Sequence, residues 1–342
     1  MKNKFKEVAK VILIIIFLTT TIKAQEITIA NWYENKSGAV VLSFDDWLPS
    51  HANIVVNQLE NHQLPATFFV TIQNTKYQKN AFIMMRKAFA NGCEIANHTL
   101  THPDLTAIDI EKAKNEILGA RKILMDSIPG NPCLSFSFPM GVKNNDLIQF
   151  LKIYHINARG INAPNENNLN YNFIKQANDY YKLETVRIWR VVTPKKVGNW
   201  LDYVTKGGGL LTFMIHSIEN ENNPAGWDPI PEKYLSEILD TVKAHQNQLW
   251  ITTMAKATQY HQQKNNTQIK IVKNSNSSTQ FKIIHTLNAT MFNHDLTILL
   301  SKEKEIKAIK IGKNNIVFKE IGNHYQFNIP YNAQKVEIIY KN

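Results

Sequence analysis

A short stretch of the chain, residues 42–47 (LSFDDW), constrains the fold more than any other. The apolar residues 39–42 (AVVL) lead directly into two adjacent carboxylates, Asp45 and Asp46. Such an aliphatic run is typical of a buried strand in a mostly parallel sheet, and sites in such folds lie at the carboxyl ends of strands. A buried carboxylate is costly unless it is paired or binds a metal. The stretch therefore favours an α/β fold with a site at this strand end, although a helix cap and a solvated Asp would also explain it.

Strand-like and helix-like segments alternate from about residue 38 to residue 262. The strand-like segments are 39–44, 66–71, 93–96, 133–138, 156–159, 210–215 and 249–253, and amphipathic helices are expected at 52–62, 81–90, 110–125 and 234–245. Repeated strand–helix units with buried strands predict a parallel sheet that is closed, or nearly closed, into a barrel. Residues 165–181 are polar and irregular, and we expect a loop insertion there.

The composition changes at residues 262–266 (QQKNN), which has the character of a linker. Short alternating segments follow, separated by Gly, Asn and Pro, and none of them is long enough for a helix of several turns. This pattern predicts a small antiparallel β-sandwich. We therefore expect a barrel domain over residues 25–262 and a C-terminal β-sandwich domain over residues 263–342.

The first 24 residues have the order of a secretory signal peptide. Four lysines precede the apolar residues 11–18, and a stretch ending at Ala24 follows. The apolar core is too short for a comfortable transmembrane helix. We expect cleavage after Ala24, export to the periplasm or the extracellular space, and no stable membrane insertion afterwards; an uncleaved anchor is the alternative.

The formal net charge of +11 is partly due to this segment. Residues 1–24 hold five Lys and one Glu, so their removal leaves a net charge of about +7. A positive chain is attracted to acidic surfaces and anionic polymers. No basic block with interleaved aromatic residues is present, so we expect no nucleic-acid partner.

A second polar cluster, residues 97–105 (NHTLTHPDL), also follows a strand-like stretch. Together with the acidic pair it offers Asp46, His98 and His102 as metal ligands. Two His and one carboxylate suit zinc, and three protein ligands leave a position for water. We expect a divalent metal, zinc first, with cobalt or nickel as alternatives. An incidental His pair is the simpler explanation of the His98–His102 spacing alone.

His216 ends the strand-like residues 210–215. At this place it is either a core histidine or a general acid. The other histidines lie in helix faces, loops or the C-terminal region, and we interpret them as structural or solvent-facing.

Four motifs of the chain, in order, resemble those of the polysaccharide deacetylase family, whose NodB homology domain defines carbohydrate esterase family 4. They are residues 43–46 (SFDD), 98–102 (HTLTH), 136–141 (FSFPMG) and 213–216 (FMIH). The resemblance runs from about residue 38 to residue 260. It implies a distorted, partly open (β/α)7 barrel, which agrees with the alternating strands and helices.

The resemblance also implies a reaction: metal-dependent hydrolysis of N- or O-acetyl groups on a polysaccharide or oligosaccharide. Asp45 would be the catalytic base and His216 the general acid. Asp46, His98 and His102 would hold the metal, and the backbone N–H of Met140 would help to hold the oxyanion. The alternatives are a hydrolase of another, non-sugar amide on the same scaffold and a catalytically inactive glycan-binding relative.

Three further residues are candidate substrate contacts: Trp47, Pro139 and Trp227. Trp47 stands where the family usually has Gly, so it either narrows the cleft and stacks on a sugar or packs under a loop. Trp227 follows His216 closely and either lines a sugar subsite or anchors a loop.

Two other departures from the family pattern concern the partners of the acid and the base. Ser137 occupies the place of an Arg that often orients the base. Arg159, at the end of another predicted strand, is our substitute, and a surface Arg is the alternative. No clear fourth motif is present, since no Asp accompanies Trp189 or Trp200 as the motif requires, so the partner of His216 is unassigned.

The chain has only two cysteines, Cys93 and Cys133, and no CxxC metal motif. Each lies at the start of a predicted strand, and the two strands are consecutive. Export would favour a disulfide between them, and two buried free thiols are the alternative.

Overall fold

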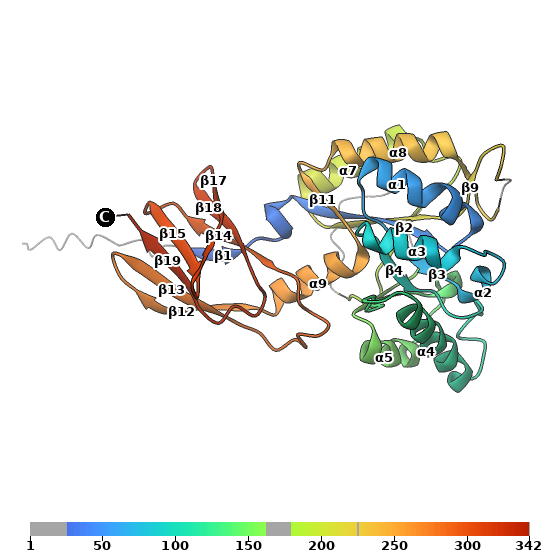
Figure 1. The fold of residues 1–342 in the computed structure, drawn as a ribbon, viewed down its shortest axis with the longest axis horizontal. Helices are drawn as coiled ribbons and strands as arrows, with labels where there is room; N and C mark the ends of the chain where they lie inside the picture. The colour runs from blue at the N-terminus through green and yellow to red at the C-terminus, as the bar shows by residue number, and fades with distance from the viewer. Residues whose placement is uncertain (1–25, 162–178, 224–225, 342) are drawn as a thin grey trace, which may run out of the picture.

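The computed structural model describes residues 26–161, 179–223 and 226–341. The predicted signal peptide and most of the predicted loop insertion at 165–181 lie outside the described residues. Two bodies are visible, an α/β barrel and an all-β sandwich, and helix α9 (Met254–Asn265) leads from the first to the second (Figure 1). Among the described helices, none is both long and apolar enough to cross a membrane.

The barrel is built on a parallel sheet with the strand order β6-β5-β4-β3-β2-β8-β7. Its strands are β2 (Gly38–Asp45), β3 (Thr67–Val70), β4 (Glu94–Asn97), β5 (Ser135–Ser137), β6 (Asn157–Arg159), β7 (Val186–Arg187) and β8 (Leu210–Ile215). A parallel bridge from Arg159 to Leu183, just before β7, brings the chain from β6 across to β8. The sheet therefore curls into a nearly closed barrel, which confirms the predicted fold class.

Strand β2 has neighbouring strands along both of its edges. It pairs with β8 along one edge, and with β3 and β11 (Leu249–Thr252) along the other. All eight of its residues are buried. Buried neighbours on both sides explain why the sequence of β2 is a continuous aliphatic run rather than an alternating one.

Helices cover the outside of the barrel, with α1, α7 and α8 on one side and α4 and α5 on another (Figure 1). The helical elements of the barrel, besides α9, are η1 (Tyr33–Asn35), η2 (His51–Val55), α1 (Val56–His62), α2 (Ile72–Thr75), α3 (Ala81–Ala90), α4 (Ile110–Ser127), η3 (Pro139–Gly141), α5 (Asn145–Tyr154), α7 (Pro194–Gly207) and α8 (Glu232–Ala244). Helices α5, α7 and α9 were not predicted. Each begins at a side-chain cap, from Asn144, Thr193 and Thr253 respectively. Pro194 in the first turn of α7 is a further start signal that the sequence analysis did not use.

The sandwich consists of two antiparallel sheets, as predicted. One has the order β12-β13-β19-β15-β16 and the other β1-β14-β18-β17. The strands are β1 (Ile27–Ile29), β12 (Gln268–Asn274), β13 (Ser278–Ile284), β14 (Leu296–Ser301), β15 (Ile306–Ile311), β16 (Asn314–Ile316), β17 (Phe318–Ile321), β18 (His324–Ile329) and β19 (Val336–Tyr340).

Strand β1 departs from the predicted domain division. Its residues pair with β14, for example Thr28 with Leu299. Residues 27–29 are therefore part of a sandwich sheet, although the sequence analysis counted them with the barrel. Nothing in their local pattern distinguishes the two, because the partner strand lies at the other end of the chain.

Both cysteines are buried and free, so the disulfide alternative is not formed in the structure. Burial raises the pKa of Cys93 to about 11 and that of Cys133 to about 12. Thiols in such surroundings stay protonated and behave as small core residues.

Candidate active site

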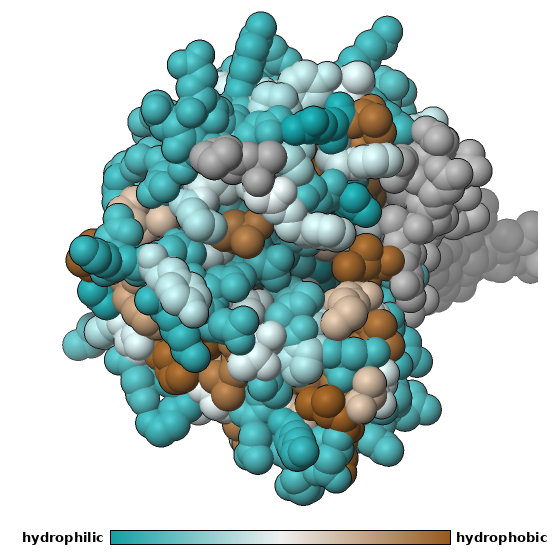
Figure 2. Space-filling model, turned by 90° about the vertical axis from the view of Figure 1, so that its right-hand side faces the viewer, coloured by the Kyte–Doolittle hydropathy of each residue, from teal (hydrophilic) through white to brown (hydrophobic). Residues whose placement is uncertain are grey.

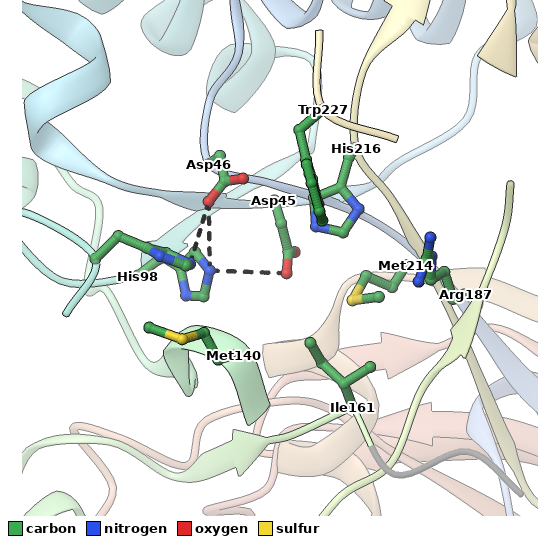
Figure 3. Close-up of a pocket in the computed structure, with 10 residues that line it drawn as sticks. Asp45, Asp46, His98, Met140, Ile161, Arg187, Met214, His216 and Trp227 are labelled. Atoms are coloured by element: carbon green, nitrogen blue, oxygen red, sulfur yellow. Dashed lines mark ion pairs between the residues drawn. The ribbon is translucent and has the colours of Figure 1, made fainter. Parts of the chain in front are cut away.

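The side chains singled out from the sequence gather at the carboxyl end of the barrel strands. Asp45 ends β2, Arg159 ends β6, and His98 and His216 directly follow β4 and β8. They surround a pocket of about 450 Å³. Its walls are formed by Asp45, Asp46, His98, His102, Met140, Ile161, Arg187, Met214, His216 and Trp227 (Figure 3).

The strands run away from the sandwich, so this end of the barrel is the one farther from it (Figure 1). Figure 2 shows that end face on: its surface is mostly hydrophilic, with a hollow near the centre and scattered hydrophobic residues around it. Sites of α/β barrels are found at this end of the strands.

Several site residues have a left-handed backbone. Positive φ angles occur at Asp46 (75°), His102 (63°), Met140 (54°) and Asp228 (49°). Non-glycine residues rarely adopt this conformation, and it persists only where surrounding contacts impose it. The turns after the strands therefore place Asp46, His102 and Met140 on the pocket wall, and another turn places Asp228 beside His216.

Asp46, His98 and His102 form a compact group of ligand atoms. Oδ1 of Asp46 lies 3.6 Å from Nε2 of His98 and 3.6 Å from Nε2 of His102, and one ligand atom from each residue lies within 4.8 Å of the others. Ligands about 2.1 Å from one tetrahedral zinc ion are about 3.4 Å apart. The spacing therefore fits a shared divalent metal.

The tautomer of His98 supports the same conclusion. Its Nδ1 donates to the carbonyl oxygen of Ser137 at 2.8 Å, which leaves Nε2 unprotonated and directed at Asp46. Metal-binding histidines are commonly oriented in this way. Burial lowers the pKa of His98, although Asp45 and Asp46 oppose the shift, so the imidazole is neutral as a ligand requires.

Asp45 and Arg159 form a buried ion pair next to these ligands. Nη2 of Arg159 contacts Oδ1 of Asp45, and both side chains are almost fully inaccessible. The guanidinium also lies over the ring of Phe69, with 4.3 Å from Cζ to the ring centroid. Arg159 is therefore paired with Asp45, the arrangement that the sequence analysis expected, and it is not a surface residue.

This pair decides the charge of Asp45. Burial alone raises the pKa of the carboxyl group, but Arg159 first, then His98 and His216, more than offset it. The net pKa lies below the ordinary value of 3.8, so Asp45 is a carboxylate at neutral pH.

His216 has a partner that the sequence analysis missed. Its Nδ1 lies 3.6 Å from Oδ2 of Asp228, and the same carboxylate receives Nε of Arg187 at 2.5 Å and Nη2 at 2.8 Å. Burial raises the pKa of Asp228, but His216 and Arg187 together lower it to about 2. The sequence did contain a signal for this partner: Asp228 directly follows Trp227, which was already a candidate site residue.

His51 also contacts His216, from behind. Its Nε2 donates to the carbonyl oxygen of His216 at 2.7 Å, and burial lowers its pKa to about 4. His51 is therefore a neutral structural residue that holds the backbone of the strand end, as the sequence analysis expected for histidines outside the motifs.

The three candidate substrate contacts differ in position. Trp227 lines the pocket with 68% of its surface exposed. Trp47 is fully buried and packs edge-on against Phe68, so its ring cannot stack on a ligand. Pro139 is buried and is not among the residues that line the pocket. The interpretation of Trp47 and Pro139 as substrate contacts is therefore wrong, because the turns that expose Asp46 and Met140 direct these two neighbours inward.

Met140 is exposed on the pocket wall. Within η3 the amide of Gly141 donates to Phe138, while the amide of Met140 has no acceptor among the described residues. An unpaired N–H next to the ligand group is available to a bound oxygen.

Comparison with known proteins finds a family model and several relatives that match part of the chain. Residues 33–158 match the family model described as polysaccharide deacetylase. The chain is 33% identical over 111 residues to a chitooligosaccharide deacetylase of Sinorhizobium fredii (strain NBRC 101917 / NGR234), a match that covers 32% of this chain and 50% of that protein. It is 34% identical over 119 residues to a chitooligosaccharide deacetylase of Bradyrhizobium sp. (strain ANU 289), covering 34% and 53% respectively.

Among solved structures, the Xyl-CE4 domain of a multidomain xylanase from the hindgut metagenome of Trinervitermes trinervoides is 18% identical, with a TM-score of 0.43, over 64% of this chain and 89% of that one. The match of residues 33–158 to this family model confirms the resemblance of the three motifs within that segment, while the fourth, residues 213–216, lies outside it. The chain spans about half the length of the first two curated relatives it matches.

Proposed function

We propose that this chain is a metal-dependent deacetylase that hydrolyses N- or O-acetyl groups on a polysaccharide or oligosaccharide. One observation supports the proposal above the others. Asp45 and His216 line the same pocket as the Asp46–His98–His102 group, and each has a charged side chain beside it, Arg159 and Asp228 respectively. A base, an acid and a ligand set are the groups that such a hydrolysis needs.

Each group has a defined task in the proposed reaction. A divalent metal held by Asp46, His98 and His102 would lower the pKa of a water molecule and polarise the acetyl carbonyl. Asp45, kept ionised by Arg159, accepts the proton that the water loses as it attacks. The N–H of Met140 donates to the developing oxyanion.

The second half of the reaction needs a proton for the leaving group. A sugar amine or alkoxide leaves poorly unless it is protonated, and His216 donates that proton. Asp228 faces Nδ1 of His216, so the other ring nitrogen, Nε2, is the one that delivers it. Trp227, Met214 and Ile161 provide apolar walls around the acetyl group.

Acetate release is the direct test. Metal-free protein is supplied with zinc, cobalt or nickel and assayed on acetylated xylan, chitooligosaccharide, peptidoglycan and a panel of non-sugar amides, with Asp45→Asn protein as the blank. We expect metal-dependent acetate release from at least one glycan. Turnover of the non-sugar amides alone would instead identify an amidase, and glycan binding without any acetate would identify an inactive relative.

We further propose that residues 1–24 direct export and are then removed. The proposal is supported by the order of lysines, apolar residues and small residues before Gln25. The mass of the exported protein tests it, because a mature chain that begins at Gln25 differs from the full chain by 24 residues. An exported chain that retains residue 1 would contradict cleavage.

A further inference from the structure

The net charge of the chain is divided unevenly between the two domains. Residues 25–262 hold 22 Lys and Arg and 22 Asp and Glu, so this segment is neutral. Residues 263–342 hold 12 Lys, no Arg and 5 Asp and Glu, a net charge of +7. Almost all the positive charge that remains after residues 1–24 therefore lies in the sandwich.

Five of these lysines share the outer face of the five-stranded sheet. Opposite residues of paired antiparallel strands point to the same side. Lys270 lies opposite Lys282, Lys273 lies opposite Gln280, and Lys310 lies opposite Glu337. The pairing of Phe281 with Val336 places Lys335 beside Lys282 one register step further on. We call Lys270, Lys273, Lys282, Lys310 and Lys335 the lysine face.

The inner side of the same strands confirms this orientation. Phe281, Ile283, Ile309, Val336 and Ile338 are buried in the sandwich core. Side chains alternate along a strand, so the lysines between these residues point outward. All five members of the lysine face are exposed or partly exposed.

One acidic residue, Glu337, lies on the same side of the sheet, opposite Lys310, and its Oε1 accepts a hydrogen bond from Nε2 of Gln280 at 2.7 Å. One carboxylate does not neutralise five lysines. Among the described residues, none of its five lysines has a carboxylate within ion-pair distance. The two sandwich ion pairs are made by other lysines, Lys302 with Glu320 and Lys341 with Glu305. Like charges directly opposite each other, such as Lys270 and Lys282, destabilise a sheet. A bound anion would offset that cost.

The composition of the domain narrows the kind of anion. The large apolar side chains exposed on the described part of the sandwich are all aliphatic, namely Ile271, Val272, Ile284, Val317 and Ile321. Without exposed aromatic rings, the domain has no platform on which neutral sugars or nucleic-acid bases could stack. Without Arg it lacks the planar donor fork that binds phosphate bidentately, and an array of Lys point charges remains.

We propose that the lysine face binds a carboxylate-bearing polysaccharide. The sandwich lies beside the barrel, away from the barrel end that carries the cleft (Figure 1). The lysine face is therefore a separate binding surface and not an extension of the cleft. A polymer held there raises the local concentration of its other segments near the protein. This inference concerns binding alone and holds whether or not the barrel is a deacetylase.

Binding of a defined acidic polymer tests the proposal. The full mature chain is titrated into fluorescein-labelled galacturonate decamer, and anisotropy is followed at several salt concentrations. The test variant combines Lys270→Gln, Lys282→Gln and Lys335→Gln. A matched control with the same change in charge combines Lys87→Gln, Lys114→Gln and Lys233→Gln on the barrel surface, where each lysine is paired with a Glu.

We expect binding to weaken as the salt concentration rises. The sandwich variant should lose about tenfold in affinity and the barrel control should change little, because each exposed ion pair contributes little free energy but the contributions of several pairs sum. Thermal unfolding of both variants verifies that they are folded. Three results would overturn the proposal: equal binding of the fully methyl-esterified decamer, an equal loss in the barrel control, or tighter binding of a DNA duplex of equal charge. The last result would identify the partner as a nucleic acid instead.

Discussion

In the barrel, Asp45 and Arg159 are buried against each other, whereas in the sandwich Lys270 and Lys282 face solvent with like charges opposite. The barrel segment has no net charge, and eight of its 22 Lys and Arg form ion pairs among the described residues. The sandwich carries a net charge of +7, and two of its 12 lysines form described ion pairs. The effect of a charge in the cleft therefore depends on the exact position of its partner. The charges on the sandwich act together through the positive potential that they produce around the domain.

The backbone differs in the same way. All ten described non-glycine residues with positive φ lie between Glu34 and Asp228, and the described part of the sandwich has none. Strained backbone is tolerated where a surrounding core imposes it, and it is concentrated at sites. A single charge change should therefore be severe in the barrel cleft and mild on the sandwich.

Removal of a metal ligand should have the largest effect. His102→Ala deletes one of three ligand atoms within 4.8 Å of one another, so we expect most bound metal and most activity to be lost. Metal content by mass spectrometry and acetate release are measured together. His324→Ala, an exposed histidine of the sandwich, is the control, and full metal occupancy in His102→Ala would contradict the ligand assignment.

Breaking the buried ion pair should follow in size. Arg159→Met leaves the Asp45 carboxylate without its partner in a closed site, which should cost about 3–5 kcal/mol of unfolding free energy. The matched change Arg190→Met breaks an exposed pair with Glu219 and should cost less than about 1 kcal/mol. Denaturant unfolding measures both, and equal costs would remove the contrast between buried and exposed charge.

Substitution of the proposed base or acid should have a different effect from substitution of a metal ligand. Asp45→Asn and His216→Ala should keep the metal but lose about 10²-fold or more in rate, as general acid–base groups do. Rate and metal content of the same preparations are compared. Near-normal turnover in either variant would show that its role is misassigned.

Acid should destabilise the barrel through its neutral histidines. Burial lowers the pKa of His155 to about 3, so the unfolded chain gains a proton below pH 6.5 that the folded chain does not. Stability is therefore full above pH 6.5 and falls as the pH drops towards 3, by about 2 kcal/mol between pH 7 and pH 5 for this residue.

Tryptophan fluorescence reports on this transition, because all six Trp lie between residues 32 and 250. His155→Gln should flatten the pH dependence, while His324→Gln in the sandwich should leave it unchanged. An identical pH dependence in wild type and His155→Gln would refute the assignment of this acid sensitivity to His155.

The smallest effect concerns the lysine face. Lys270→Glu replaces a like-charge pair opposite Lys282 with an attractive one, so we expect it to stabilise the protein by about 0.2–1 kcal/mol. Lys270→Gln should give about half of the gain, and both gains should shrink at high salt. Destabilisation by Lys270→Glu would show that the two side chains do not interact.

The sequence predicted what depends on local pattern. Buried aliphatic runs identified the barrel strands, and β-type alternation identified the sandwich. The pairing of Arg159 with Asp45 could be predicted because the carboxyl ends of parallel strands meet at one edge of the sheet. Helices α5 and α7 were missed although their buried residues have helical spacing, for example Leu147 and Leu151 in α5 and Val197 and Leu201 in α7. Helix α9 was missed because its buried residues do not form a single apolar face.

Asp228 was missed for a different reason. It reaches His216 only because the chain after β8 returns on itself: β9 (Ile218–Glu219) pairs with β10 (Ile230–Pro231), and the amide of Ser217 donates to the carbonyl of Trp227. Trp47 was misjudged because a left-handed turn sends its ring inward. The local sequence around Asp228 and Trp47 does not indicate either of these two backbone features.

Strand β1 has a consequence for how the molecule is put together. The amide of Glu26 donates a hydrogen bond to the side chain of Ser301, 275 positions further along the chain. The chain therefore forms the first strand of the sandwich, then the whole barrel, and then the remaining strands of the sandwich. During synthesis β1 has no partner strand until β14 has been synthesised. Once both are paired, the barrel is fastened to the sandwich by two crossings of the chain, at β1–β2 and at α9–β12, and two attachments restrict the swivelling that a single linker would permit.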